Sequence, residues 1–184
     1  MHPIIEVAGP NRIIPEVTSL TATRLILLCG LPGSGKTTLA KRLAAELPAV
    51  RLCPDEWLAG LGVDPYDEPV RDRLEELFRQ HARDLLTLGQ SVILEFGFWA
   101  RAERDELRLA ARALGAAVEL HYLEAPLEEL CRRLEARNKA GAWGTVPITR
   151  DLLERWATLF EAPTSAELAL FDEPPDARSA ATTG

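Results

Sequence analysis

An apolar stretch that runs straight into a glycine-rich turn is the feature that most constrains this chain. Residues 24–29, RLILLC, have the character of a short buried strand, and GLPGSGKT follows at residues 30–37. The glycines let the backbone curl tightly and turn several N–H groups inward, and Lys36 begins a helix expected to extend to residue 47. Inward amides at the positive end of a helix bind oligophosphate, so this stretch predicts a nucleotide site.

The spacing of the turn is that of the Walker A motif: Gly30, four residues, then Gly35, Lys36 and Thr37. The lysine of this motif reaches the outer phosphates, and the threonine hydroxyl is placed to bind Mg²⁺. A chance glycine turn is a poor alternative, because strand, turn and helix follow one another as the motif requires. The residues predicted to bind the nucleotide here are Gly30, Leu31, Pro32, Gly33, Ser34, Gly35, Lys36, Thr37 and Thr38.

Strand-like and helix-like segments alternate along the rest of the chain, which predicts a parallel sheet with helices on both faces. The strands are expected at residues 24–29, 50–53, 91–96, 117–123 and, as a last strand, 168–171. The helices are expected at residues 36–47, 69–88, 101–114, 126–138 and 149–160, with one helical turn in the loop 54–68. One domain over residues 24–171 is predicted, between an N-terminal arm (1–23) and a disordered tail (172–184).

Composition narrows the class of protein. A formal net charge of −7, from 21 basic and 28 acidic residues, is poorly suited to holding long nucleic acid. No run approaches the roughly 18 apolar residues of a membrane helix, so no membrane association is expected. The three cysteines lack metal-type spacing, which favours reduced thiols in a cytoplasmic protein.

Two carboxylates follow predicted strands, where ligands of parallel sheets gather. Asp55, after the second strand, is placed to accept a proton from an attacking hydroxyl; alternatively it caps a helical turn. Glu95 ends the apolar run SVILEF. Its carboxylate is predicted to hold Mg²⁺ through a water or to orient a substrate; a buried structural ion pair is the alternative.

Arginines and aromatic residues also lie near the predicted strand ends. Arg101 and Arg104 are candidate substrate-binding residues, with salt bridges to neighbouring acids as the alternative. Trp57 and Trp99 are expected to line an acceptor pocket or to close the core. Arg133 and Arg137 share a helix face at positions i and i+4, and a solvated face paired with acids is their alternative role.

The stretches LLCGLPGSGKTTLAKRLA, PDEW, SVILEFGFWARAERDELR and LEARN resemble small P-loop kinase-like proteins of the AAA type. These are similar to chloramphenicol phosphotransferase, the kinase domain of polynucleotide kinase and zeta-type toxin kinases. The resemblance covers residues 24–166. It implies a P-loop NTPase three-layer α/β sandwich with a five-stranded parallel sheet in the order 2-3-1-4-5 and a mobile lid, here at about 138–148.

The resemblance also implies an activity, the transfer of the γ-phosphate of ATP to a hydroxyl of a small molecule. Lys36 and Arg137 would stabilise the moving phosphoryl group, Asp55 would act as the base, and Arg133 would border the adenine. Thr37 and Glu95 would hold Mg²⁺, although relatives often carry Asp where this chain has Glu95. No motif specifies the acceptor or an oligomeric state.

Two other functions remain open at this point: a polynucleotide 5′-hydroxyl kinase and a nucleotide-binding ATPase or regulator without phosphotransfer. The acidic net charge disfavours the first. A hydrolytic AAA ATPase often has two adjacent acids at the end of its third strand, whereas Glu95 is followed by Phe96. The sequence therefore favours transfer to a small molecule.

Overall fold

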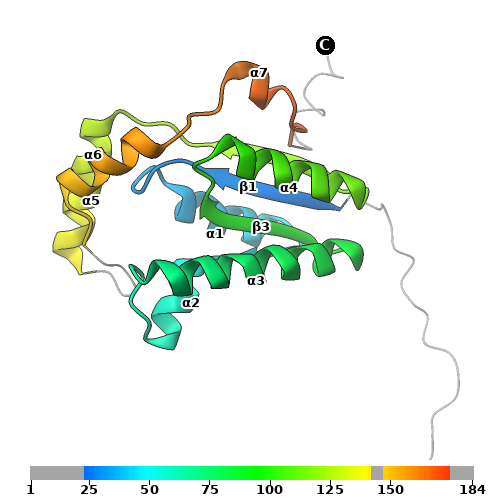
Figure 1. The fold of residues 1–184 in the computed structure, drawn as a ribbon, viewed down its shortest axis with the longest axis horizontal. Coiled ribbons are helices and arrows are strands. Elements are labelled where there is room, and N and C mark those ends of the chain that lie inside the picture. The colour runs from blue at the N-terminus through cyan, green and yellow to red at the C-terminus, as the bar shows by residue number, and fades with distance from the viewer. Residues whose placement is uncertain (1–22, 142–146, 175–184) are drawn as a thin grey trace, which may run out of the picture.

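The computed structural model describes residues 23–141 and 147–174, and within them four parallel strands form one sheet in the order β2-β3-β1-β4 (Figure 1). The strands are β1 (Arg24–Cys29), β2 (Ala49–Leu52), β3 (Ser91–Gly97) and β4 (Ala117–Tyr122). In the central register Leu25 of β1 lies opposite Val92 of β3 and Val118 of β4. The carboxyl ends of the strands point toward α5 and α6 (Figure 1).

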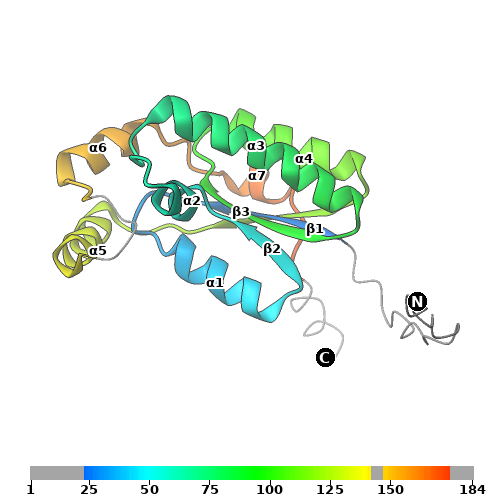
Figure 2. The ribbon, with the colours of Figure 1, turned by 90° about the horizontal axis from the view of Figure 1, so that it is seen from below.

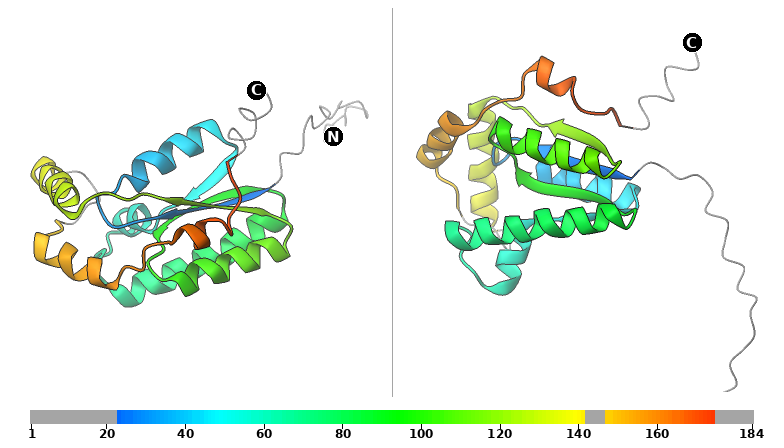
Figure 3. Two further views of the ribbon diagram at one scale, coloured as in Figure 1. Left: turned by 90° about the horizontal axis from the view of Figure 1, so that it is seen from above. Right: turned by 45° about the vertical axis from the view of Figure 1, so that its right-hand side comes forward.

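The described helices are α1 (Lys36–Glu46), α2 (Pro54–Leu61), α3 (Glu68–Thr87), α4 (Arg101–Ala113), α5 (Leu127–Ala140), α6 (Arg150–Leu159) and α7 (Ser165–Leu168). Figures 2 and 3 show α1 on one face of the sheet and α3 and α4 side by side on the other. This three-layer α/β arrangement confirms the predicted fold class. Helices α5 and α6 lie beyond the carboxyl ends of the strands (Figures 1 and 2).

The core explains why the strands read as continuous apolar runs. Leu25 and Leu27 of β1 pack with Phe78 of α3, whereas Ile26 and Leu28 pack on the α1 side. Successive side chains of a strand point to opposite faces, so a sheet covered on both sides requires apolar residues at every position. All four of these β1 residues are at most 2% exposed.

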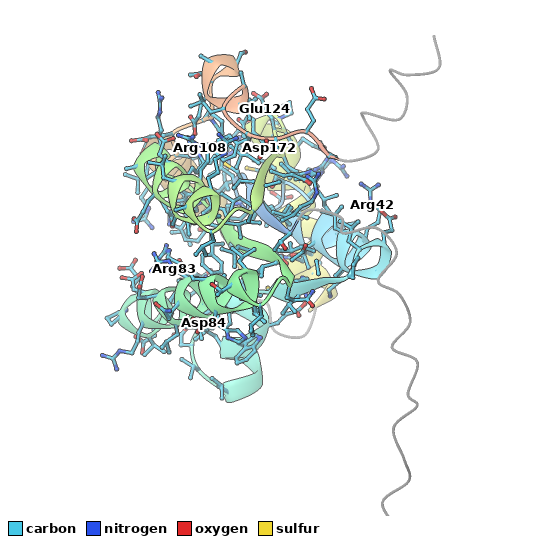
Figure 4. The ribbon with its side chains drawn as sticks, turned by 90° about the vertical axis from the view of Figure 1, so that its right-hand side faces the viewer. Arg42, Arg83, Asp84, Arg108, Glu124 and Asp172 are labelled. Carbon is cyan, nitrogen blue, oxygen red and sulfur yellow. The ribbon has the colours of Figure 1, made fainter. Side chains whose placement is uncertain are left out.

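The predicted fifth strand at residues 168–171 is wrong. The chain does return to the outer edge of β4, but there it forms the short helix α7 and a turn. Asp172, labelled in Figure 4, binds the edge of β4 without adding a strand: its N–H donates to the Val118 carbonyl at 2.7 Å, and its carboxylate accepts from the Val118 N–H at 2.7 Å. Within the described residues, the sheet therefore has four strands.

Two interactions favour helix over strand in this segment. Thr164 caps α7, its hydroxyl accepting from the Glu167 N–H at 3.2 Å. Glu167 is buried and forms an ion pair with Arg104 of α4. The apolar sequence LALF gives no sign that Glu167, the residue before it, is the buried partner of Arg104.

Several predicted segments lie partly or wholly outside the described residues. The arm is described only at residue 23, and the tail only at 172–174. Of the predicted lid, residues 142–146 are outside, whereas 138–140 belong to α5. Cys29, Cys53 and Cys131 are buried and unbridged. In the described part, no helix is long and apolar enough to cross a membrane.

Candidate active site

The turn after β1, residues 30–37, is called the phosphate loop below. Gly30 has φ 144° and Gly33 has φ 81°, a region that side chains rarely tolerate. A Cβ atom at Gly30 would lie 2.6 Å from the Leu123 carbonyl oxygen, and one at Gly33 would lie 3.1 Å from Leu134 Cγ. Only glycine therefore fits these two positions, which bring the loop against the end of β4 and against α5.

The Lys36 side chain folds back onto the phosphate loop. Its Nζ donates to the carbonyl oxygens of Gly30 at 2.8 Å and Leu31 at 3.0 Å. Burial lowers the pKa of Lys36 to about 8, while the carboxylates of Glu95 and Asp55 act to raise it. An ammonium so placed is available to an anion that enters the loop.

The loop also contains an unused polar group. The hydroxyl of Ser34 is buried and has no hydrogen-bond partner in the described part of the chain. A buried hydroxyl without a partner normally costs stability, so its presence fits a loop that receives a ligand. Together with the Lys36 ammonium and the helix start at α1, it suits the phosphates of a nucleotide.

Thr37 and Glu95 meet beside the loop. The Thr37 hydroxyl donates to Glu95 Oε1, and Arg51 of β2 donates from Nε to Glu95 Oε2 at 2.8 Å. The Glu95 side chain is only 4% exposed. A hydroxyl and a carboxylate are oxygen donors of the kind Mg²⁺ prefers, and this ion keeps several waters and takes few protein ligands.

Arg51 was not found by sequence reasoning, yet it organises this side of the site. Besides Glu95 it binds both oxygens of Glu56, at 2.8 and 3.0 Å. These hydrogen bonds lower the pKa of Glu56 to about 2, and Lys41 contributes to the same shift. The available signal was a basic residue inside the otherwise apolar strand sequence AVRL.

Asp55 is the second residue of α2, and its side chain is 63% exposed. The alternative role as a helix cap is not what the structure displays: the cap position is Cys53, and the Asp55 carboxylate instead accepts a hydrogen bond from Arg71 of α3. Asp55 also acts on the pKa of both Lys36 and Arg137. The negative charge of Asp55 thus favours the charged forms of both Lys36 and Arg137.

The two arginines of α5 differ in their surroundings. Arg133 is exposed, forms an ion pair with Glu129 at 2.6 Å and donates to the Gly33 carbonyl at 3.3 Å, beside the phosphate loop. Arg137 is half-buried, and burial lowers its pKa. Its Nε is buried without a hydrogen-bond partner in the part of the chain that is described. Both positions are compatible with the predicted roles.

The prediction that Arg104 binds substrate is wrong. Arg104 is fully buried: Nε and Nη2 bind the two oxygens of Glu167 at 2.6 and 3.0 Å, and Nη1 donates to the Phe98 carbonyl at 2.8 Å. All of its donor groups hold α4, α7 and the turn after β3 together. Arg101, in contrast, is exposed and contacts Asp105 at 3.5 Å, so its predicted role remains a prediction.

Aromatic side chains lie near the same strand ends. Trp57 is 51% exposed and packs edge-on against Phe78, with ring centres 5.0 Å apart. The ring centres of Trp99 and Trp156 of α6 lie 5.6 Å apart. Those of Trp156 and Tyr66, in the loop before α3, lie 6.4 Å apart. Tyr66 and Trp156 were not predicted as site residues, because no local pattern joins three such distant segments.

The turn that carries Trp99 has an unusual backbone. Phe98 has φ 47° although it is not glycine, and its side chain is 1% exposed. Its carbonyl accepts from both Arg104 and the Cys29 thiol, the latter at 3.4 Å. A strained residue persists only where its surroundings fix it, so the core determines this turn.

Several solved structures share this fold. A chain of the Pnkp1/Rnl/Hen1 RNA repair complex matches with a TM-score of 0.63 and 22% identity, over 75% of this chain and 44% of that one. The present chain thus spans less than half the length of that protein. A sugar kinase from Janibacter sp. matches with a TM-score of 0.58 and 23% identity, over 87% and 93% of the two chains.

Kti12 from Chaetomium thermophilum, solved in complex with ADP-AlF3, matches with a TM-score of 0.58 and 19% identity, over 77% of this chain and 82% of that one. At these identities the matches establish the fold. No curated protein matches the chain. Residues 25–163, most of the chain, match the model of the AAA domain family, which confirms the resemblance to P-loop kinase-like proteins. The chain therefore belongs to the AAA domain family.

Proposed function

We propose that this protein is an ATP-dependent phosphotransferase that moves the γ-phosphate of ATP to a hydroxyl of a small molecule. The observation that carries the proposal is the phosphate loop, in which Lys36 Nζ lies at the carbonyl oxygens of Gly30 and Leu31 and the buried Ser34 hydroxyl has no partner among the described residues. The charges of Asp55 and Arg137 both act on the pKa of the Lys36 ammonium, which lies in the mouth of the phosphate loop. ATP would bind in this loop, and the carboxylate of Asp55, which follows β2, is the proposed proton acceptor.

In the proposed step, the acceptor hydroxyl oxygen forms a bond to the γ-phosphorus of ATP. The bond from that phosphorus to the oxygen bridging to the β-phosphorus breaks, and ADP leaves with that oxygen. The hydroxyl proton goes to the Asp55 carboxylate. Such transfer depends mainly on positioning and on stabilising charge, so a carboxylate beside the hydroxyl suffices as base.

The cationic residues supply the charge stabilisation. Lys36 would leave the carbonyl oxygens of Gly30 and Leu31 and bind the outer phosphates, which offer it a charged acceptor in place of two neutral ones. Arg137 carries a buried Nε without a partner in the described residues. A phosphoryl oxygen would satisfy this donor, so Arg137 is the proposed residue that neutralises the moving group.

The residues beside the loop fit a magnesium ion. Mg²⁺, when bound, would neutralise charge on the ATP phosphates. Thr37 would offer its hydroxyl, and Glu95 would act directly or through a water, with Arg51 fixing the orientation of its carboxylate. Because Arg51 removes part of the negative charge of Glu95, the water-mediated role is the one we propose.

The acceptor would lie between Asp55 and the aromatic side chains at the strand ends. Trp99, together with Tyr66 and Trp156, supplies apolar faces, and Trp57 and Arg101 remain candidates at the rim. Such a wall suits a small ring-bearing or sugar-like alcohol. The sugar kinase among the structural matches supports this class of acceptor.

A polynucleotide 5′-hydroxyl kinase is the second candidate, because a chain of an RNA repair complex shares the fold. The net charge of −7 disfavours it. The test is a screen in which ATP and Mg²⁺ are incubated with hydroxyl-bearing metabolites, antibiotics and a 5′-hydroxyl oligonucleotide while ADP release is followed. Phosphate on a small molecule supports the proposal. Phosphate only on the oligonucleotide selects the second candidate, and ATP binding with no acceptor indicates a nucleotide-dependent regulator.

A further inference from the structure

Arg71 of α3 uses each nitrogen of its guanidinium group for a different partner. Nη2 donates to Asp55 Oδ1 of α2, Nε donates to the Pro65 carbonyl at 3.1 Å, and Nη1 lies 3.5 Å from Glu75 Oε1. The Arg71 side chain is 27% exposed, whereas that of Asp55 is 63% exposed. The planar guanidinium therefore joins the exposed Asp55 carboxylate to the Pro65 carbonyl and to the largely buried Glu75 carboxylate.

Glu75 provides the buried side of this arrangement. Its side chain is 14% exposed, and burial raises its pKa to about 7, while Arg71 and Arg79 act to lower it. Arg79 in turn binds Glu103 of α4 and lies over the ring of Phe96, 5.7 Å from its centre. Alternating charges thus link Asp55 through α3 to α4, so the position of Arg71 is fixed by the body of the domain.

We propose that Arg71 is a positioning residue that fixes the orientation of the Asp55 carboxylate for proton transfer. The inference rests on the proposed function, because it requires Asp55 to act as the base. An exposed carboxylate in the first turn of a helix is otherwise able to rotate toward the free N–H groups there. Arg71 prevents this rotation. It also ties the base to Pro65, the neighbour of Tyr66, so the base and the proposed acceptor wall are fixed together.

The test uses ATP with water as the phosphoryl acceptor, so that it does not depend on the identity of the acceptor. In that reaction the water oxygen bonds to the γ-phosphorus, the bond to the bridging oxygen breaks, a proton passes to Asp55, and ADP and phosphate are released. The variants are Arg71→Gln, Arg71→Lys, Asp55→Asn and the double variant Asp55→Asn with Arg71→Gln. Arg73→Gln, at an exposed arginine of the same helix, is the control.

Arg71→Gln should lower kcat for ADP release by about tenfold or more, because a displaced base costs positioning, while KM for ATP stays within about twofold. Arg71→Lys should be faster than Arg71→Gln but slower than the wild type, because lysine keeps the positive charge but lacks the planar set of donors of the guanidinium. The double variant should be no slower than Asp55→Asn alone. Equal rates for Arg71→Gln and Arg73→Gln, or losses that multiply in the double variant, would overturn the inference.

A second measurement needs no turnover. The Nη–H signals of Arg71 in ¹⁵N–¹H NMR spectra should move in Asp55→Asn, because Nη2 donates to Asp55 Oδ1, whereas those of Arg73 should not. An unmoved Arg71 signal overturns the inference even where hydrolysis is too slow to follow. If Asp55→Asn moves the signal but leaves the rate of phosphoryl transfer unchanged, the pairing is present and the proposed base is wrong. The failure of the inference and the failure of the proposed function are therefore distinguishable.

Discussion

Arg51 of β2 and Glu95 of β3 are joined by a 2.8 Å hydrogen bond between neighbouring strands, directly beside the phosphate loop. The opposite oxygen of the same carboxylate accepts from Thr37. Thr37 of α1, Glu95 of β3 and Arg51 of β2 thus form a continuous set of polar contacts.

Lys36→Ala should abolish detectable phosphoryl transfer and weaken ATP binding, because the loop loses the ammonium that faces the outer phosphates. Lys41→Ala is a matched control on the same helix, since Lys41 contacts Glu56 at 3.1 Å and not the loop. Equilibrium binding of a fluorescent ATP analogue measures the effect. Equal affinities for the two variants would contradict the assignment of Lys36.

Asp55→Asn should leave ATP affinity nearly unchanged while lowering turnover by about 10²-fold or more, the usual scale for a lost general base. The amide keeps the size of the side chain but does not accept the proton. Binding and turnover are measured on the same preparation. Full activity of the asparagine variant on the true acceptor would remove Asp55 from the proposed mechanism.

ATP binding should depend on the charge of Lys36, whose pKa is lowered by burial to about 8. The charged form predominates below that pH and is the form that bound phosphates favour, so affinity should be constant well below pH 8 and fall above it. At pH 8 about half of the lysines are neutral, and binding should take up about half a proton. Calorimetry in buffers with different ionisation enthalpies measures this uptake. No uptake at pH 8 would contradict the prediction.

Much of the fold was predictable because it depends on local patterns. The four strands were read from apolar runs, and the phosphate loop from its glycines and Lys36. The fifth strand failed because Glu167 is satisfied by Arg104, 63 residues away. Arg51 and Arg71 were missed for the same reason: Arg51 pairs with Glu95 and Arg71 with Asp55, each on another element, and periodicity within one element carries no information about such pairs.

Arg51→Met should destabilise the protein by about 3 kcal/mol, because it leaves the buried Glu95 carboxylate without its main cation. Glu56→Gln, at a side chain that is 41% exposed, should cost less than about 1 kcal/mol. Urea unfolding of both variants gives the comparison. If the two midpoints are equal, Arg51 does not have the stabilising role assigned to it.

Glu167→Gln should destabilise the protein by about 3 kcal/mol or more, because the fully buried Arg104 loses its counter-charge. The double variant Arg104→Met with Glu167→Leu should recover much of this loss, since it removes both charges. ATP affinity of the folded double variant should match that of the wild type. A specific loss of nucleotide or acceptor binding would instead restore a direct role for Arg104.

The lack of space for a side chain at Gly30 affects which parts of the site can change during evolution. The nucleotide end of the site is shaped by main chain, where a single substitution meets the backbone of Leu123 at 2.6 Å. The wall formed by Tyr66, Trp99 and Trp156 is shaped by side chains, which point mutations exchange without moving the chain. If the proposed function holds, single substitutions in this wall can change the acceptor while the nucleotide end of the site stays fixed.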